Sequence, residues 1–154
     1  MKIALVQMDV VHGQPVENKK HVIEMLERAL DDNPDVIVLP EMWNTGYALD
    51  ELDGLADKEG LNSQELLSHF ARKHAVAIIG GSVAIEKDGK FYNTTYVYNK
   101  SGDLINTYSK VHLFGLMAED QYMSAGSSES VFELDGVTAT SAVSYTHLRA
   151  HETR

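Results

Sequence analysis

Several features that proteins commonly contain are scarce or absent in this chain. It has no cysteine, which excludes a disulfide framework and thiolate metal sites. Its 13 Lys and Arg residues are outnumbered by 23 Asp and Glu residues, so the formal net charge is −10. Because phosphate groups and anionic membrane surfaces are bound by basic faces, this balance disfavours nucleic acid and membranes as partners.

Long apolar runs are also missing. No stretch approaches the roughly 18–20 apolar residues that a membrane-spanning helix needs. The N-terminus, MKIALVQMDVV, has no small-residue cleavage site and soon reaches Asp9, so we expect a first strand rather than a signal peptide. Together these absences predict a cytoplasmic protein. The 154 residues, 44% of them hydrophobic, are enough for one domain with a true core, or for a piece of one.

The first half of the chain alternates between apolar β-type runs and amphipathic helical runs. The first run is almost wholly apolar, as a strand buried on both faces would be. Two strand–helix–strand crossovers predict a parallel sheet with helices on a face. The expected elements are a strand at 2–8, a helix at 16–31, a strand at 35–39, a helix from Leu61 to about His74, and a strand at 76–79.

The second of these helices has a recognisable N-terminal signal. Asn62 can cap the helix, and Glu65 can reach back toward the cap. Leu61 can pack against Leu66 as a hydrophobic staple. We therefore expect Asn62 to satisfy the free N–H groups of the first helical turn.

The second half reads as antiparallel strands joined by tight turns. Parallel units that pass into hairpins predict an α/β layered fold. The turns are Asp88-Gly89 and Ser101-Gly102, between β-rich runs at 82–85, 91–98 and 104–109, and Asp135-Gly136, between runs at 131–134 and 137–143.

One candidate for chemistry follows a predicted strand directly. Glu41 comes right after the apolar run VIVLP, and in parallel α/β folds sites assemble at the carboxyl ends of strands. Partial desolvation between Pro40 and Met42 would raise the pKa of Glu41, which suits a general base near neutral pH. The alternative is a helix-capping or solvent-facing acid, and Glu41 alone does not decide between the two.

Two further candidates lie in apolar settings later in the chain. Lys110 ends a β-type run and is followed by VHLF, where a localised positive charge could stabilise an oxyanion. Glu119 lies in a polar break between two apolar pairs and could orient Lys110 or a substrate. Taken alone, a strand-end lysine and a loop acid are more often ordinary surface residues.

The histidines do not form a metal-site motif. His69 and His74 are five residues apart, which is wrong for one helix face, and no HExxH is present. His147 and His151 are four apart and could chelate a metal on a helix, but no third ligand is nearby in the sequence. We therefore expect no metal site.

The segments that hold these candidates, taken together, resemble the nitrilase-like carbon–nitrogen hydrolase superfamily. The phrases NTGY, HLFGLM and YMSAG are most similar to its ω-amidase or 2-oxoglutaramate amidase group. The likeness covers about the first 140 residues and runs in order through KIALVQMDV, VIVLPEMWNTGY, GGSVAIEKDGKFYNTTYVYNKSGDLINTYSKVHLF and SAGSSESVFELDGVTAT.

The resemblance implies an α/β fold, the N-terminal half of an αββα four-layer sandwich, in a homodimer or larger homo-oligomer. It implies a Glu–Lys–Cys triad with Glu41 as base, Lys110 as the oxyanion-stabilising lysine and Glu119 as a supporting glutamate. It implies no metal or organic cofactor. The substrate would be a small linear amide, an ω-amide of a dicarboxylic acid such as 2-oxoglutaramate. Tyr47 and Phe114 would be pocket walls, although core packing explains aromatic residues more often.

The sequence departs from the family where the catalytic cysteine belongs. Counting from the Gly-Val turn, that position holds Ser144, and Thr146 stands where the family has Asp. A serine hydroxyl is a far weaker nucleophile than a thiol at neutral pH, and this triad has no histidine to relay its proton. We therefore expect no amidase turnover from this chain.

The last segment, SYTHLRAHETR, looks like translated adapter or vector sequence. We expect residues 1–143 to be the N-terminal part of a carbon–nitrogen hydrolase domain and residues 144–154 to be a non-native tail. The alternative is a catalytically inactive binding or assembly module that keeps the fold. A third reading is a plain α/β domain with incidental acids, which would fall if Glu41 and Lys110 lay together in a pocket.

Overall fold

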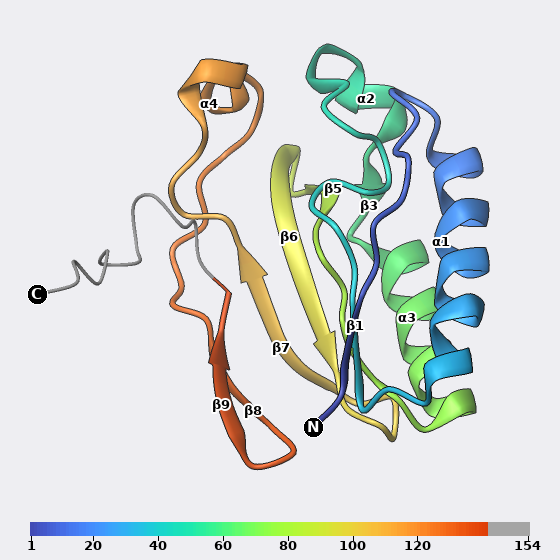
Figure 1. Ribbon diagram of the computed structural model, residues 1–154. Coiled ribbons are helices and arrows are strands. Elements are labelled where there is room, and N and C mark those ends of the chain that lie inside the picture. The colour runs from blue at the N-terminus through green and yellow to red at the C-terminus, as the bar shows by residue number, and fades with distance from the viewer. Residues whose placement is uncertain (142–154) are drawn as a thin grey trace, which may run out of the picture.

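Figure 1 shows the computed structural model, in which residues 1–141 are described. Within these residues a seven-stranded mixed sheet has the order β1-β2-β4-β6-β5-β3, β7 pairs with β6, and β8 and β9 form a two-stranded sheet. The strands are β1 (Ile3–Leu5), β2 (Val36–Val38), β3 (Asp57–Lys58), β4 (Ala77–Ile79), β5 (Val83–Lys87), β6 (Lys90–Tyr98), β7 (Leu104–Ser109), β8 (Val131–Leu134) and β9 (Val137–Thr140). The helices are α1 (Pro15–Ala29), α2 (Leu52–Leu55), α3 (Leu61–His74) and α4 (Glu119–Tyr122), with 3₁₀ turns η1 (Leu30–Asp32), η2 (Leu49–Glu51) and η3 (Gly115–Met117).

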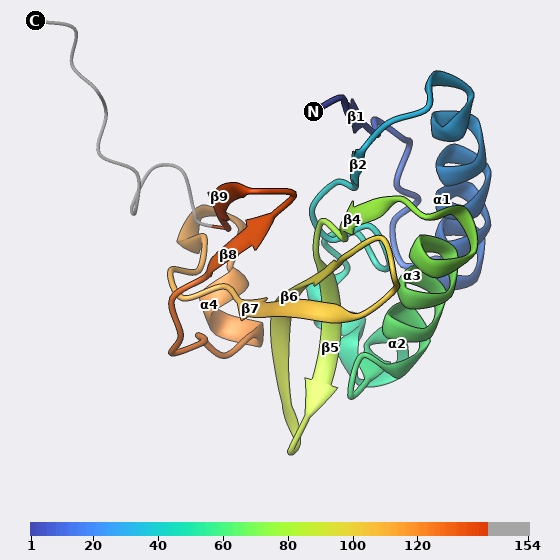
Figure 2. The ribbon, with the colours of Figure 1, turned by 90° about the horizontal axis from the view of Figure 1, so that it is seen from below.

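The elements form layers on the two faces of the large sheet. Figures 1 and 2 show α1 and α3 side by side on one face and the β8–β9 hairpin on the other. The larger core lies under the helices and includes Val22 and Leu26 of α1 and Leu67 and Phe70 of α3. The smaller core lies under the hairpin and joins its buried side chains to β2, β4 and β6; it contains Phe132, Leu134, Val36, Ala77 and Val97.

The predicted parallel half of the sheet is confirmed. Strand β1 pairs with β2, and β2 with β4, all in parallel. Helix α1 has Pro15 in its first turn, where a missing N–H breaks no helical hydrogen bond. Val22 and Leu26 are fully buried on its apolar stripe. Because β2 ends at Val38, the next few residues lie at the carboxyl end of the parallel strands.

The prediction that the first strand is buried on both faces is wrong. Ile3 and Leu5 are 53% and 75% exposed. The physical reason is position, because β1 is an edge strand and the β8–β9 hairpin packs on β2, β4 and β6 instead. One face of β1 is therefore left open within residues 1–141.

The predicted hairpins are confirmed. Strands β5 and β6, β6 and β7, and β8 and β9 pair antiparallel. At the first turn φ is 51° at Asp88 and 69° at Gly89, and at the last it is 50° at Asp135 and 78° at Gly136. Two consecutive positive φ values are what a type I′ turn requires, and Asp-Gly is a favoured pair for it. Strand β9, expected at 137–143, ends at Thr140.

The start of α3 corrects the capping prediction. The helix follows Gly60, whose φ is 67°, and Asn62 does not cap it. Asp57 supplies the acceptors instead, since its two carboxylate oxygens accept the N–H groups of Asn62 at 3.2 Å and Ser63 at 2.8 Å. Leu61 is 64% exposed, so the expected staple is not formed. Strand β3, which is too short to show a sequence pattern, places the Asp57 carboxylate where helical N–H groups lack partners.

Replacing Asp57 by alanine should therefore destabilise the fold. We expect Asp57→Ala to lower the free energy of unfolding by about 1–2 kcal/mol, the usual cost of a lost helix cap. Urea unfolding followed by circular dichroism measures this. Asp31→Ala is the matched control, because it also removes one negative charge but from an exposed side chain. Equal losses in the two variants would show that Asp57 does not act as the cap.

Candidate active site

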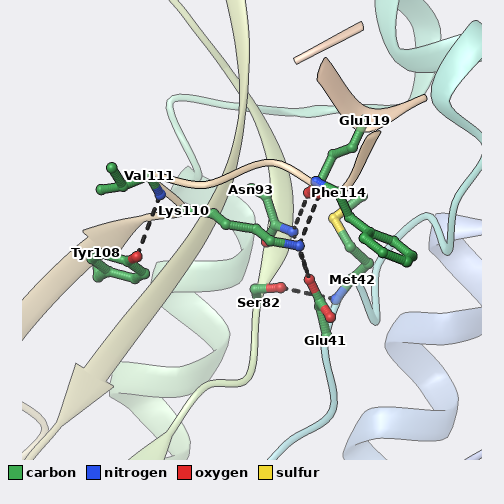
Figure 3. Close-up of polar contacts among 9 residues, drawn as sticks. All are labelled: Glu41, Met42, Ser82, Asn93, Tyr108, Lys110, Val111, Phe114 and Glu119. Atoms are coloured by element: carbon green, nitrogen blue, oxygen red, sulfur yellow. Dashed lines mark hydrogen bonds and ion pairs between the residues drawn. The ribbon is translucent and has the colours of Figure 1, made fainter. Parts of the chain in front are cut away.

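Four segments that are distant in sequence meet at one end of the sheet. Glu41 lies in the loop after β2, Asn93 lies in β6, Lys110 follows β7, and Glu119 is the first residue of α4. Figure 3 shows their polar groups pointing toward one another. The structure therefore brings together the three residues singled out from sequence, Glu41, Lys110 and Glu119, and adds a fourth.

Close backbone packing fixes the loop that carries Glu41. Gly81 has a φ of 58°, and a Cβ there would lie 2.0 Å from the carbonyl oxygen of Pro40. Ser82 then binds the loop on both sides of Glu41: its N–H donates to the Pro40 oxygen at 3.1 Å, and its hydroxyl accepts the N–H of Met42 at 3.0 Å. Only glycine fits at position 81, so the bend after β4 holds the Glu41 backbone in place.

A second close approach fixes Lys110. A Cβ on Gly126 would lie 2.1 Å from the carbonyl oxygen of Ser109, and the N–H of Gly126 donates to the Lys110 oxygen at 2.9 Å. On the other side, the N–H of Lys110 donates to the Asn93 oxygen at 2.8 Å. The main chain of Lys110 is thus held between β6 and the segment after α4.

The side chain of Lys110 joins the two glutamates. Its Nζ lies 2.9 Å from Oε1 of Glu41 and 2.8 Å from Oε2 of Glu119. The three side chains differ in solvent exposure: Glu119 is 0% exposed, Lys110 10% and Glu41 48%. The inner pair is buried, while the Glu41 carboxylate is open to solvent.

Glu119 is buried, and both of its carboxylate oxygens accept hydrogen bonds. Its Oε1 accepts the Asn93 amide at 2.8 Å, and its Oε2 accepts the Lys110 ammonium and the backbone N–H of Phe114 at 2.7 Å. A buried carboxylate without such donors would be very costly. Phe114, expected to wall a pocket, thus binds Glu119 through its main chain, and its side chain is half-buried.

Asn93 was not recognised from the sequence. It is buried, and its Nδ2 donates to Oε1 of Glu41 at 2.9 Å and to Oε1 of Glu119 at 2.8 Å. A signal existed, because asparagine is disfavoured inside strands and this one interrupts the β-rich run FYNTTYVY. An amide held in mid-strand indicates a specific polar contact.

The neighbours of Glu41 and Lys110 favour the charged form of each. Burial would raise the pKa of Glu41, but the hydrogen bond and charge of Lys110, with hydrogen bonds from Asn93 and Tyr47, hold it below its ordinary value of 4.5. The predicted upward shift for Glu41 is therefore wrong, because an ammonium group lies against the carboxylate. Burial would lower the pKa of Lys110, but hydrogen bonds and charges from Glu119 and Glu41 raise it above its ordinary 10.5. Tyr47, also expected as a pocket wall, thus bonds to Glu41.

The sequence of this chain is similar to that of known proteins. The carbon-nitrogen hydrolase family profile matches residues 2–149. The chain belongs to this family. The 2-oxoglutaramate amidase of Bacillus subtilis (strain 168) is 46% identical to this chain over 93% of the chain and 55% of its own length. An omega-amidase of Saccharomyces cerevisiae is 34% identical over 74% of the chain and 42% of its own length. The chain therefore spans about half the length of the curated relatives it matches.

Solved structures confirm the nitrilase-like α/β fold. A CN-hydrolase superfamily protein from Xanthomonas campestris, with an arsenic adduct in its active site, has a TM-score of 0.80 at 26% identity, covering 89% of this chain and 50% of that one. A nitrilase-superfamily member from Saccharomyces cerevisiae has a TM-score of 0.80 at 27% identity, covering 90% and 53%. The mixed sheet with its helices is thus the architecture of this hydrolase family.

Some sequence-based expectations concern residues that the structure does not describe. Ser144, His147, His151 and the whole 144–154 segment lie outside the described residues. Within residues 1–141 no group of three or more His, Asp or Glu side chains is placed to hold a metal ion. The helices of that same part are too short or too polar to cross a membrane. The expectations of no metal and of a non-native tail therefore stay predictions.

Loss of the Lys110 charge should destabilise the fold strongly. We expect Lys110→Met to lower the free energy of unfolding by about 3–5 kcal/mol, because it leaves the Glu119 carboxylate buried and unpaired. Lys100 is a matched control, since its Nζ also pairs with two carboxylates, Asp35 at 3.3 Å and Asp135 at 2.6 Å, but is more exposed. Lys100→Met should cost about 0–1 kcal/mol. Similar losses in both variants, measured by urea unfolding, would contradict the buried ion pair.

We expect acid to destabilise the fold in part by protonating Glu41. Because its pKa is lowered in the folded state, its ionised form stabilises the fold above the ordinary 4.5, and this contribution disappears as the pH falls through the lower folded-state value. We expect wild type to lose more unfolding free energy than Glu41→Gln between neutral pH and acid below 4.5. Urea unfolding at a series of pH values measures the difference. Glu24→Gln, on the exposed side of α1, should follow wild type.

Proposed function

We propose that Glu41, Lys110 and Glu119 are the acid–base and oxyanion-stabilising part of an amidase site for a small ω-amide of a dicarboxylic acid, such as 2-oxoglutaramate. The observation that supports this best is the Lys110 ammonium held between two carboxylates, one buried and one open. The substrate is suggested by the relative named 2-oxoglutaramate amidase, which is 46% identical.

The proposed reaction is a two-step acyl transfer to a cysteine thiol. Glu41 takes the thiol proton, the thiolate attacks the amide carbonyl, and the protonated Glu41 then gives its proton to the departing ammonia. Glu41 next takes a proton from water, whose oxygen attacks the thioester. The carbon–sulfur bond then breaks, the carboxylic acid is released, and Glu41 gives its proton to the thiolate. An ammonium group has three donors, and with two directed at glutamates Lys110 can offer one more to the oxyanion.

The electrostatics suit this division of roles. Glu41 is ionised at neutral pH and reaches solvent, so it can accept a proton. Its lowered pKa makes it a weak base, and the thiol must therefore be acidified as well, which the neighbouring Lys110 ammonium would do. Glu119 is fully buried, so it serves to hold Lys110 and does not exchange protons with the substrate. Tyr47 and Phe114 would line the substrate pocket.

The nucleophile is proposed to lie in sequence that replaces residues 144–154 in the parent protein. None of the 154 residues is cysteine. We propose residues 1–143 as the native part of the domain and a cytoplasmic homo-oligomer as the parent.

Ammonia release from 2-oxoglutaramate tests the proposal. We expect no release by the chain itself, because it lacks the thiol. The protein encoded when the locus is read past codon 143 should release ammonia, and Glu41→Gln in it should lower kcat by about 10²–10⁴-fold, the usual contribution of a general base. Glu24→Gln is the control and should keep full activity.

Three results would contradict or redirect the proposal. Ammonia release by the chain itself, lost on Glu41→Gln, would mean that no cysteine is needed. A longer protein that stays active without Glu41 would remove this residue from the mechanism. A natural stop codon after Arg154 would favour the inactive binding module.

A further inference from the structure

The charges in the cluster do not balance. Two carboxylates, Glu41 and Glu119, bind one ammonium, Lys110, so the three side chains carry a net charge of −1 when all are ionised. Two carboxylates that share one site ordinarily keep a proton between them, because like charges at short range disfavour double ionisation. Hydrogen-bond donors placed between the two acids oppose such sharing.

Asn93 donates to both acids. An amide NH₂ has two hydrogens, and those of Asn93 are divided between the carboxylates, with Nδ2 at 2.9 Å from Oε1 of Glu41 and 2.8 Å from Oε1 of Glu119. Both N–H groups of this amide therefore donate to the two acids. Because an NH₂ group only donates, each of the two oxygens that face it uses one lone pair to accept the amide.

The position of this amide is fixed by the sheet. Asn93 lies in β6 opposite Ala84 of β5, its backbone oxygen accepts the Lys110 N–H at 2.8 Å, and it is 3% exposed. These main-chain contacts do not depend on the Asn93 side chain. A substitution at position 93 can therefore remove the amide while β6 keeps its pairing.

Oxygen Oε1 of Glu41 is doubly occupied. It accepts Asn93 at 2.9 Å and Lys110 at 2.9 Å. A proton on this oxygen would have to displace one of the two donors. The remaining neighbour, Tyr47, does not impose this restriction, because a phenol hydroxyl can both donate and accept.

We infer that Asn93 is a positioning residue that keeps Glu41 and Glu119 from sharing a proton and directs any proton taken up by Glu41 to its Oε2 atom. In the proposed amidase reaction, on which this catalytic reading rests, the S–H bond of the thiol breaks and the new O–H bond forms at Oε2. Oε1 stays bound to Lys110 and Asn93 throughout.

The titration of Glu41 in this chain tests the inference without any need for turnover. The carboxyl carbon resonance of Glu41, assigned by its loss in Glu41→Gln, is followed against pH by NMR. Asn93 offers two donors to the acids, serine offers one and alanine none. We expect the titration midpoint of Glu41 to rise from wild type to Asn93→Ser and again to Asn93→Ala.

Asn44 provides a matched control. It is also a buried asparagine, and its side chain binds the N–H and the oxygen of Ala84 at 2.9 Å each, with no bond to a carboxylate. Asn44→Ala should destabilise the fold yet leave the Glu41 midpoint unchanged. An unchanged midpoint in Asn93→Ala, or an equal shift in Asn44→Ala, would overturn the inference. If Asn93→Ala does not fold, Asn93→Ser decides by the same two outcomes.

Kinetics of the longer protein separate this inference from the proposed function. There Asn93→Ala should lower kcat with little change in KM and move the acidic limb of the pH–rate profile upward, whereas Asn44→Ala should not move that limb. A shifted Glu41 midpoint in a protein without amidase activity would uphold Asn93 and reject the amidase. An active amidase with an unmoved acidic limb would reject Asn93 alone.

Discussion

The ammonium of Lys110, held between two carboxylates, is the interaction on which the site and much of the surrounding fold depend. The three groups come from the loop after β2, the end of β7 and the start of α4, and no local sequence preference brings these segments together. The buried Glu119 carboxylate is tolerable only because Lys110, Asn93 and the Phe114 N–H surround it. The contacts that hold these three segments together are therefore the same contacts that set the electrostatics of the site.

The graded exposure of the cluster gives each acid a different character. Glu119 and Lys110 form a largely buried inner pair, where the attraction between opposite charges is stronger than at the surface. Glu41 shares the same ammonium but reaches solvent, so it can change its protonation state while the inner pair persists. In the proposed amidase reaction the fixed cation would stabilise the oxyanion and the solvent-exposed carboxylate would accept the proton.

Local patterns in the sequence predicted what local physics decides. The apolar run before Pro40 gave a strand with Glu41 at its carboxyl end, and the Asp-Gly pairs gave type I′ hairpins. The parts that were missed depend on distant partners. Asp57 caps α3 from a strand of two residues, and Asn93 bonds to an acid 52 positions away. The pKa direction of Glu41 was wrong because it is decided by Lys110, which is 69 residues further along the chain.

The glycines beside the site have a consequence for how its function can be lost. Gly81 lies against the Pro40 carbonyl and Gly126 against the Ser109 carbonyl, each too close for any side chain. A single methyl group at either place would push a neighbouring main chain aside and carry Glu41 or Lys110 with it. A substitution that adds neither charge nor a reactive group can thus misalign the reactive groups, because these two positions set the spacing of the main chain.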